Sequence, residues 1–368
     1  MRFHVIARDI QRHDAVGNFC RQMAALLQSR GAEVSLAAEN CHDDDRNTIA
    51  RLPAALGEIG PADVVFFHFS TEDPALPVVA ALPNRKVIYF QNITPERFFL
   101  PDDPERAQNV RQGLAQRAFA ARFDVLMANS RVTARVLHDG LSPDDQARIG
   151  QSSIVACPPI VGIDRLAGVA AAPVPLPAVD RLVLFVGRLT PHKNIHALVQ
   201  AFSVLAAADE GVGLAIAGTP TDPTYTRRLI AEVEGLRPDI ARRVAFLHNV
   251  PDGTLRFLFD RASVFASMSG HEGFCVPLVD GMVFDKPLVI SAEPGMMETA
   301  GSAALVIADP APVDIANALA AAINDTAVAH RLASARKQRL TELRALADGN
   351  LILKAAEAAA NAKGALRR

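Results

Sequence analysis

Short apolar runs alternate with helical patterns along the whole chain, and this alternation constrains the fold most strongly. Several of the runs are apolar on successive residues, which is typical of strands covered on both faces, as in a parallel sheet. In the first half they lie at residues 3–7, 34–38, 63–69, 86–90, 125–128 and 154–156. In the second half they lie at residues 182–186, 214–217, 244–247, 264–267, 288–291 and 304–307. The pattern predicts an α/β chain with doubly wound parallel sheets.

The chain is long enough for two such sheets, because 368 residues correspond to two domains at about 150 residues each. A proline-rich stretch over residues 157–179 is the best candidate boundary, and a fresh strand begins after it. We therefore predict a Rossmann-like domain over 1–165, a linker over 166–180 and a second Rossmann-like domain over 181–345. The Ala-rich segment 346–368 is predicted to be a C-terminal helix that packs back on the N-terminal domain.

Composition excludes several classes of protein. A net charge of −2 provides no basic field for nucleic acid. No apolar run approaches the roughly 20 residues of a membrane-spanning helix, and residues 2–8 are too charged for a signal peptide. The cysteines form no Cys-x-x-Cys pair and lie in no metal-ligand spacing, which argues against structural zinc and disulfides. We expect a cytoplasmic protein without bound metal.

Ligands of open parallel sheets bind at the loops that follow the carboxyl ends of strands. The first such loop, residues 14–18, contains Gly17 at the start of a helix. A glycine allows the backbone to approach a ligand, and a helix N-terminus favours anions. The alternative is that Gly17 only permits a tight turn between strand and helix.

The second loop carries two cations beside a glycine. The strand at 182–186 ends at Gly187, and Arg188 and Lys193 follow at the start of a helix. Arg presents a planar fork to phosphate oxygens and Lys a compact charge, so together they would stabilise a diphosphate that gains charge as it leaves. The alternative is a pair of solvated surface cations.

The third loop follows the strand at 264–267 and is the most specific. Pro277 suits the first turn of a helix, and the preceding N–H groups would face an anion. These N–H groups belong to Gly273, Phe274, Cys275 and Val276. Two carboxylates beside a diphosphate, Glu272 and Asp280, are best explained as hydrogen-bond acceptors for sugar and ribose hydroxyls. Asp280 alone is also explained as an acidic residue near a helix N-terminus.

These motifs resemble a known family. Val-Gly-Arg-x4-Lys-Asn, then Glu-Gly-Phe-x-Val-Pro-x2-Asp-Gly-Met, then Lys-Pro-Leu-Val, are similar to retaining GT-B glycosyltransferases of glycosyltransferase family 4. The resemblance covers essentially the whole chain and implies two Rossmann-like domains that face a central cleft. The segments at 14–18 and 92–95 look like the branch that builds bacterial polysaccharides on lipid-linked intermediates, often with GDP-mannose.

The resemblance implies a role for each matching position. Arg188 and Lys193 would neutralise the donor diphosphate, Glu272 would contact hydroxyls of the transferred sugar, and the backbone at 273–276 would hold phosphate. Gly187 and Gly17 would lie against the donor, Gly17 alternatively against the acceptor. Asp280 would bind the ribose; the family usually has Glu there, so the shorter Asp implies a weakened or water-mediated contact.

One departure from the family lies in the N-terminal half. The related branch commonly has His before the Asn-Ile-Thr-Pro segment, and this chain has Gln91 followed by Asn92. Gln forms hydrogen bonds but cannot become a cation near neutral pH. Gln91 would orient the acceptor or sugar without charge, or another His would take the role, or activity would be reduced. His68 is the candidate for that His, although a lone His after an apolar strand is more often structural. His271, before Glu272, is expected to contact donor or acceptor.

The resemblance implies a retaining transfer of a hexose, foremost mannose from GDP-mannose, to a saccharide acceptor. The acceptor would be linked to polyprenyl diphosphate in polysaccharide biosynthesis, and neither cofactor nor metal would be needed. Two alternatives stay open. One is a sugar-nucleotide epimerase or phosphorylase on the same scaffold. The other is a non-catalytic partner that binds sugar nucleotides.

A lipid-linked acceptor would bring the protein to the inner face of the cell membrane as a peripheral protein. Residues 97–100 and the helix with Arg106, Arg111, Arg117 and Arg122 are candidates for contact with anionic lipid. The alternative is an ordinary surface helix with solvated arginines.

Overall fold

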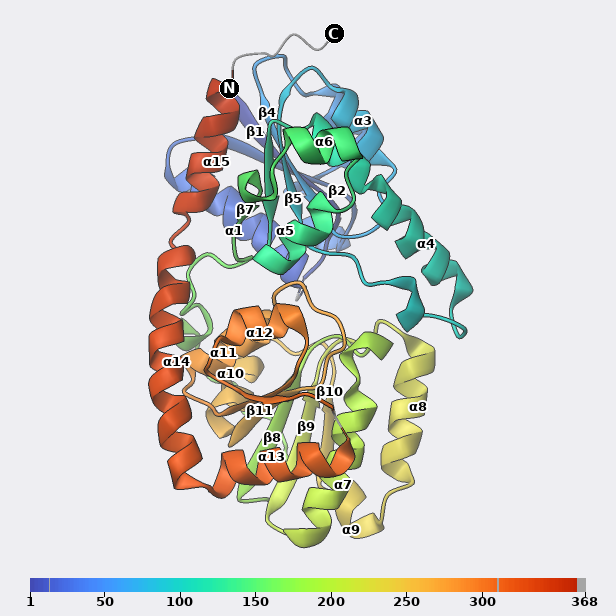
Figure 1. Cartoon of the computed structure of the whole chain (residues 1–368), viewed down its shortest axis with the longest axis vertical. Coiled ribbons are helices and arrows are strands. Elements are labelled where there is room, and N and C mark those ends of the chain that lie inside the picture. Colours follow the sequence, from blue (N-terminus) through green and yellow to red (C-terminus); the bar gives the residue numbers. More distant parts are fainter. Residues whose placement is uncertain (13, 310, 363–368) are drawn as a thin grey trace. The chain divides into compact units, whose positions relative to one another are not determined.

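A computed structural model describes residues 1–12, 14–309 and 311–362 (Figure 1). The chain forms two compact units. Unit 1 comprises Met1–Gly162 together with the C-terminal part from Ala345, and unit 2 comprises Ile163–Arg344. Each unit contains one sheet, and the strand pairs of both sheets are parallel. The predicted GT-B fold class, with two doubly wound Rossmann-like units, is confirmed.

The sheet of unit 1 has the order β3-β2-β1-β4-β5-β6-β7. Its strands are β1 (Arg2–Ile10), β2 (Glu33–Cys41), β3 (Ile49–Arg51), β4 (Val64–Phe69), β5 (Arg85–Phe90), β6 (Val125–Ala128) and β7 (Val155–Ala156). Its helices are α1 (Ala15–Ser29), α2 (Leu52–Gly57), α3 (Ala75–Ala81), α4 (Pro104–Ala115), α5 (Arg131–His138), α6 (Pro143–Arg148) and α15 (Asn350–Asn361).

The sheet of unit 2 has the order β10-β9-β8-β11-β12-β13. Its strands are β8 (Arg181–Val186), β9 (Val212–Ala217), β10 (Val244–Leu247), β11 (Val264–Ser267), β12 (Leu288–Ser291) and β13 (Leu305–Ile307). Its helices are α7 (Ile195–Ala208), α8 (Pro223–Glu234), α9 (Pro238–Ala241), α10 (Asp252–Arg261), α11 (Val276–Val283), α12 (Pro294–Ala300), α13 (Pro312–Asn324) and α14 (Thr326–Leu346), the last of which runs into unit 1.

Every apolar run predicted above as a strand is a strand. Each residue of β4, β9, β11 and β12 is buried, as a strand covered on both faces requires. The short strand β3 was missed, because Ile49 is its one buried residue and three residues carry no periodicity.

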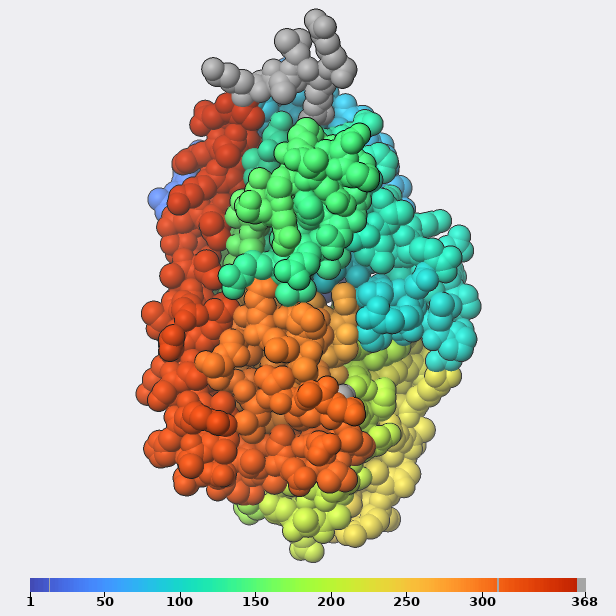
Figure 2. All heavy atoms as spheres, viewed as in Figure 1, coloured from blue at the N-terminus to red at the C-terminus, as the bar shows by residue number. Residues whose placement is uncertain are grey.

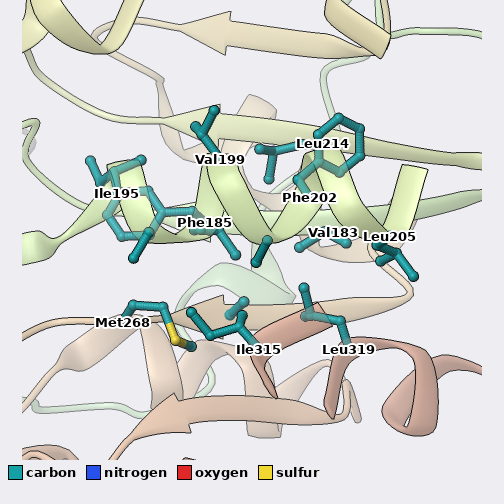
Figure 3. Close-up of a cluster of buried hydrophobic side chains, with 14 of the residues drawn as sticks. Val183, Phe185, Ile195, Val199, Phe202, Leu205, Leu214, Met268, Ile315 and Leu319 are labelled. Atoms are coloured by element: carbon teal, nitrogen blue, oxygen red, sulfur yellow. The ribbon is translucent and has the colours of Figure 1, made fainter. Parts of the chain in front are cut away.

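Helices cover both faces of each sheet. In unit 2, α7 packs on β9 and β11 and α13 packs on β11, β12 and β13, and Figure 3 shows Phe202 and Leu319 in the apolar cluster that they share. In unit 1, α1 and α15 pack on one face through residues such as Phe19 and Ile352, and α3 and α5 cover the other. Loops follow the carboxyl ends of the strands, and the helices do not cover these ends.

The boundary between the units lies after Gly162, close to residue 165 where we expected the first domain to end. The expected linker, residues 166–180, is part of unit 2 and is bound to α10. The N–H of Ala172 donates to the carbonyl of Gly253 (2.9 Å), and Arg256 donates to the carbonyl of Val169 (3.1 Å).

The C-terminal helix expected over 346–368 is α15. It begins at Asn350, because Gly349 separates it from α14 with a positive φ of 83°. Its buried residues Ile352, Ala355 and Ala359 belong to the core of unit 1. Residues 363–368 lie outside the described part of the chain.

Candidate functional site

The switch point of the unit 2 sheet lies between β8 and β11, because the chain continues from these two strands toward opposite edges of the sheet. From β8 the chain continues to β9 on one side, whereas β11 and β12 lie on the other side. The loops after these two strands diverge at this point, which is where open α/β sheets bind their ligands. They are residues 187–194 and 268–275, the second and third candidate loops of the sequence.

The loop after β8 lies very close to the end of β9. The N–H of Gly187 donates to the carbonyl of Ala217 (3.0 Å), and a Cβ on Gly218 would lie 1.7 Å from the carbonyl oxygen of Gly187. A side chain at residue 218 would therefore displace the loop. The loop then forms the short 3-10 turn Pro191–Lys193, and Asn194 (φ 51°) leads into α7.

The two candidate loops meet at an ion pair. Lys193 Nζ lies 2.5 Å from Glu272 Oε1, and the two side chains are 14% and 9% exposed. Ser269 Oγ donates to the same Oε1 (2.8 Å), and the N–H of Gly270 donates to the carbonyl of His192 (2.8 Å). Two residues that are 79 positions apart thus form one charged site.

Arg188 lies on the same loop as Lys193 and is exposed. Within the described residues its guanidinium forms no hydrogen bond and no ion pair. Its donors are therefore available to an anion from solution.

The loop after β11 turns sharply into α11. Cys275 adopts the left-handed conformation (φ 63°) just before the helix, and Pro277 occupies the first turn. In the described chain no side chain caps this helix N-terminus. Phe274 and Cys275 are buried, and the carbonyl of Phe274 accepts from Thr299 Oγ1. These contacts hold the backbone of the predicted phosphate loop in place, and among the described residues no side chain caps the helix that follows it.

A residue that we did not predict supports Glu272 from α12. Glu293 caps this helix by accepting from the N–H of Met296 (2.8 Å), and its carboxylate also accepts from the backbone of Glu272. Burial raises the pKa of Glu293 to about 7, and the nearby charge of Glu272 adds to the rise. A Cβ on Gly295 would lie 2.4 Å from the carbonyl oxygen of Glu272. The signal in the sequence was Glu293 before Pro294-Gly295, an N-terminal helix signature.

Asp280 lies in α11 and is partly buried. Desolvation raises its pKa to about 7, although the charge of Arg165 lowers it. In the described part of the chain its carboxylate accepts no hydrogen bond. Both oxygens are thus available to hydroxyl donors, such as those of a ribose.

Gly17 lies in the first turn of α1, and its missing side chain makes room for the loop that follows β1. A Cβ there would lie 2.2 Å from the carbonyl oxygen of Gln11. The N–H groups of Val16 and Gly17 donate to the carboxylate of Asp14 (3.0 and 3.3 Å). This geometry gives Gly17 a role in the tight turn, and its predicted contact with a ligand stays a prediction.

Gln91 and His68, considered as alternatives, form a pair in unit 1. Gln91 Nε2 donates to His68 Nδ1 (3.1 Å). His68 is 1% exposed, and burial lowers its pKa to about 3, so it is neutral near pH 7. A buried imidazole holds a proton poorly, and the expectation that His68 replaces a cationic histidine stays a prediction. Asn92 follows in the left-handed region (φ 71°), and its Oδ1 accepts from the N–H of Ile93 (2.9 Å).

One of the arginines expected at a lipid surface has a structural role. Arg117 donates to the carbonyls of Leu114 (2.7 Å) and Val136, and desolvation lowers its pKa. Arg117 is partly buried by these contacts, and its predicted contact with lipid stays a prediction. Arg111 forms an ion pair with Glu96. Atoms of α4 lie on the surface of unit 1 (Figure 2).

The described residues include neither a helix that could span a membrane nor a cluster of potential metal ligands. In the described ranges of the chain, no helix is long and apolar enough to cross a membrane. The same ranges contain no group of three or more His, Cys, Asp or Glu side chains arranged to hold a metal ion.

Comparisons with known proteins agree with this geometry. Residues 171–339 match the model of the family described as Glycosyl transferases group 1. O-antigen chain mannosyltransferase B of Escherichia coli is 29% identical over 149 residues, which cover 37% of this chain and 34% of that protein. The chain spans about a third of the length of such curated relatives.

Solved structures extend the likeness to the whole chain. A UDP-forming trehalose-phosphate synthase of Burkholderia xenovorans has a TM-score of 0.70 at 15% identity and covers 98% of this chain and 99% of its own. Anabaena Alr3699/HepE, solved with UDP and glucose, has a TM-score of 0.70 at 16% identity and covers 97% and 100%. Residues 171–339 thus resemble the Glycosyl transferases group 1 family, and the chain as a whole has the GT-B fold.

Proposed function

We propose that this protein is a retaining glycosyltransferase that moves a hexose from a nucleotide diphosphate sugar to a saccharide acceptor. The observation that carries the proposal is the Lys193–Glu272 ion pair at the switch point of the unit that matches the family, on the loop that also carries Arg188, a side chain without a partner among the described residues. One carboxylate and two cations on adjacent loops suit a ligand with both hydroxyls and a diphosphate.

Each residue has a step in this chemistry. The bond between the anomeric carbon and the diphosphate oxygen breaks, and Arg188 and Lys193 neutralise the negative charge that develops on the diphosphate. Glu272 holds Lys193 in place and accepts hydrogen bonds from the sugar hydroxyls. The uncapped N-terminus of α11 faces the phosphates, and the Asp280 carboxylate accepts from the ribose.

Retention follows if the acceptor oxygen bonds to the face from which the diphosphate leaves. The acceptor proton then passes to a phosphate oxygen, so no nucleophile of the protein takes part. Two cations in place of a divalent ion make this mechanism independent of metal.

Mannose is our first choice of sugar, with GDP-mannose as donor. The support is the likeness over 149 residues to a relative named as an O-antigen chain mannosyltransferase, together with the polysaccharide-type motifs at 14–18 and 92–95. A polyprenyl-diphosphate-linked saccharide would be the acceptor, and the surface of α4 would bring the protein to the membrane.

A thermal-shift panel of GDP-mannose, UDP-glucose and the free nucleotides tests donor binding, because a ligand of the native state raises the melting temperature. We expect the largest rise with GDP-mannose. Arg188→Ala combined with Lys193→Ala should abolish that rise, whereas Lys337→Ala, an exposed cation of the same unit, should leave it intact.

Product analysis separates the alternatives. Proton NMR of the product should show the anomeric configuration of the donor, and an inverted configuration would contradict the mechanism. A changed sugar nucleotide in the absence of acceptor would indicate an epimerase. Donor binding without turnover on any saccharide would indicate a non-catalytic binding protein.

A further inference from the structure

A second switch point lies in unit 1, between β1 and β4. In the order β3-β2-β1-β4-β5, the chain continues from β1 to β2 on one side and from β4 to β5 on the other. Arg8 lies near the end of β1, and Thr71, Glu72 and Asp73 follow the end of β4. Ligands of open α/β sheets bind at such a point, and no residue of this cluster has a role in the chemistry proposed above.

The side chains at this point form a connected polar cluster. Arg8 Nη1 donates to Glu72 Oε2 (2.7 Å) and to the carbonyl of Glu72. Asn109 of α4 donates to the same Oε2 (3.4 Å), and Thr71 Oγ1 donates to Asn109 Oδ1 (3.1 Å). The side chains of Arg8 and Glu72 keep 26% and 19% of their surface exposed, so a solute can reach them.

The backbone under the cluster is rigid. Gln116 accepts from the N–H of Asp73 and donates to its carbonyl, each at 2.9 Å. A Cβ on Gly113 would lie 2.6 Å from the backbone nitrogen of Glu72, so α4 approaches the loop as closely as a glycine allows. The cluster is therefore organised before any ligand arrives, which lowers the entropic cost of binding.

The cluster has unused hydrogen-bonding capacity. Within the described residues, Nε and Nη2 of Arg8 and Oε1 of Glu72 form no hydrogen bond. Asp73 is 1% exposed, its Oδ1 accepts from the N–H of Ala75 (2.8 Å), and its Oδ2 is buried without a partner. A buried acceptor normally has a donor, so the unpaired Oδ2 indicates that a hydroxyl or a bridging water completes the cluster.

The charges of the cluster favour a neutral ligand over an anionic one. The single cation Arg8 faces three carboxylates, namely Glu72, Asp73 and, 4.0 Å from its Nε, Glu39. Such an excess of negative charge repels phosphates and uronates. A neutral sugar suits it, because each hydroxyl can donate to a carboxylate and accept from the guanidinium.

We propose that Arg8, Glu72 and Asn109 bind the hydroxyls of a neutral pyranose, the terminal sugar of the saccharide acceptor. The inference rests on the proposed function for the role of that sugar as acceptor. Binding of a neutral pyranose at this place is a separate statement that holds or fails without transfer.

Ligand-observed NMR on the full chain measures binding directly, with methyl α-D-mannopyranoside as the neutral probe and methyl α-D-glucopyranosiduronate as its anionic counterpart. We expect a saturation-transfer signal from the neutral glycoside that Arg8→Lys and Glu72→Gln reduce at least about fivefold. Glu357→Gln, an exposed carboxylate on α15, is the matched control and should leave the signal unchanged. An equal or stronger signal from the uronate would overturn the proposal.

Enzyme kinetics test whether this pyranose site binds the acceptor during sugar transfer. With the donor identified by thermal shift, Glu72→Gln should raise KM for methyl α-D-mannopyranoside about tenfold, the effect of one lost charge-assisted hydrogen bond. KM for the donor and its hydrolysis by water should stay the same. If the folded variants keep the KM for the acceptor and the NMR signal of the wild type, the proposal is overturned. If Glu72→Gln does not fold, the same two measurements on Arg8→Lys, which keeps the charge, provide the test. Failure of donor binding in the wild type would contradict the proposed function instead, because the NMR signal does not require a donor.

Discussion

The Lys193–Glu272 contact joins two loops of unit 2 through a largely buried pair of opposite charges. Each side chain is largely buried, and each neutralises the charge of the other at 2.5 Å. Removal of one partner leaves a charge that is poorly solvated, which is more costly than removal of both. The pair thus holds the two side chains, and the loops that carry them, in place.

We predict that Lys193→Ala lowers the free energy of unfolding by about 1–3 kcal/mol, because the largely buried carboxylate of Glu272 then loses its cation at 2.5 Å. The double variant Lys193→Ala/Glu272→Gln should lose less than Lys193→Ala alone. Urea denaturation of the single and double variants measures the difference. A double variant that is the least stable of the set would contradict this account.

A second prediction at the scale of the residue concerns Asp280. Its pKa is raised from about 3.9 in the unfolded chain to about 7 by desolvation, so between these pH values the native state binds more protons than the unfolded state. Its contribution to stability is therefore present below about pH 4 and is lost as the pH rises to about 7.

Asp280→Asn removes this titration. The stability of the variant relative to the wild type should increase from pH 4 to pH 7 and stay constant above. Denaturation at a series of pH values measures it, with Asp314→Asn, at an exposed position of α13, as the control. A constant difference over the whole range would show that Asp280 titrates like a solvated carboxylate.

At the scale of the element, close contacts between loops hold the candidate site. The end of β9 and the loop after β8 touch at a glycine, and α12 touches the backbone of Glu272 at another. Neither helix nor strand propensity explains these glycines, because their role is to let two backbones approach.

Gly218→Ala should lower the free energy of unfolding by about 3 kcal/mol or more, because its Cβ would overlap the carbonyl oxygen of Gly187. The displaced loop carries Arg188 and Lys193, so donor binding should fall as well. Gly168→Ala is the matched control in the same unit, because a Cβ there meets no atom within 4 Å. Thermal denaturation with and without donor checks both effects, and a Gly218→Ala protein as stable as Gly168→Ala would contradict them.

At the scale of the whole molecule, the chain returns to unit 1 after it has completed unit 2. The helix α15 lies near the C-terminus, yet it buries Ile352, Ala355 and Ala359 in the same core as Phe19 and Met23 of α1. The stability of unit 1 consequently depends on residues far from it in sequence.

Ile352→Ala should destabilise unit 1 by about 3 kcal/mol, through lost burial and the cavity that remains. Lys354→Ala, on the exposed face of the same helix, should have little effect. Differential scanning calorimetry should show a lower transition for unit 1 and an unchanged transition for unit 2. Equal shifts of both transitions would show that the units unfold together.

The strands and the loops that carry the candidate site followed from local pattern. Apolar runs between glycines and helical stripes predicted every strand except β3, and the carboxyl-end rule pointed to the loops with Arg188, Lys193 and Glu272. These features depend on neighbours in sequence, or on motifs whose order and spacing are visible in the chain.

Tertiary structure alone decided which distant side chains meet and which are removed from water. It paired Lys193 with Glu272 and Gln91 with His68, buried His68, and joined Arg8 to Glu72. The physical reason is that contact and desolvation depend on which strands become neighbours and how tightly their loops pack. Spacing along the chain specifies neither, so a histidine that looks available in the sequence can end in the core.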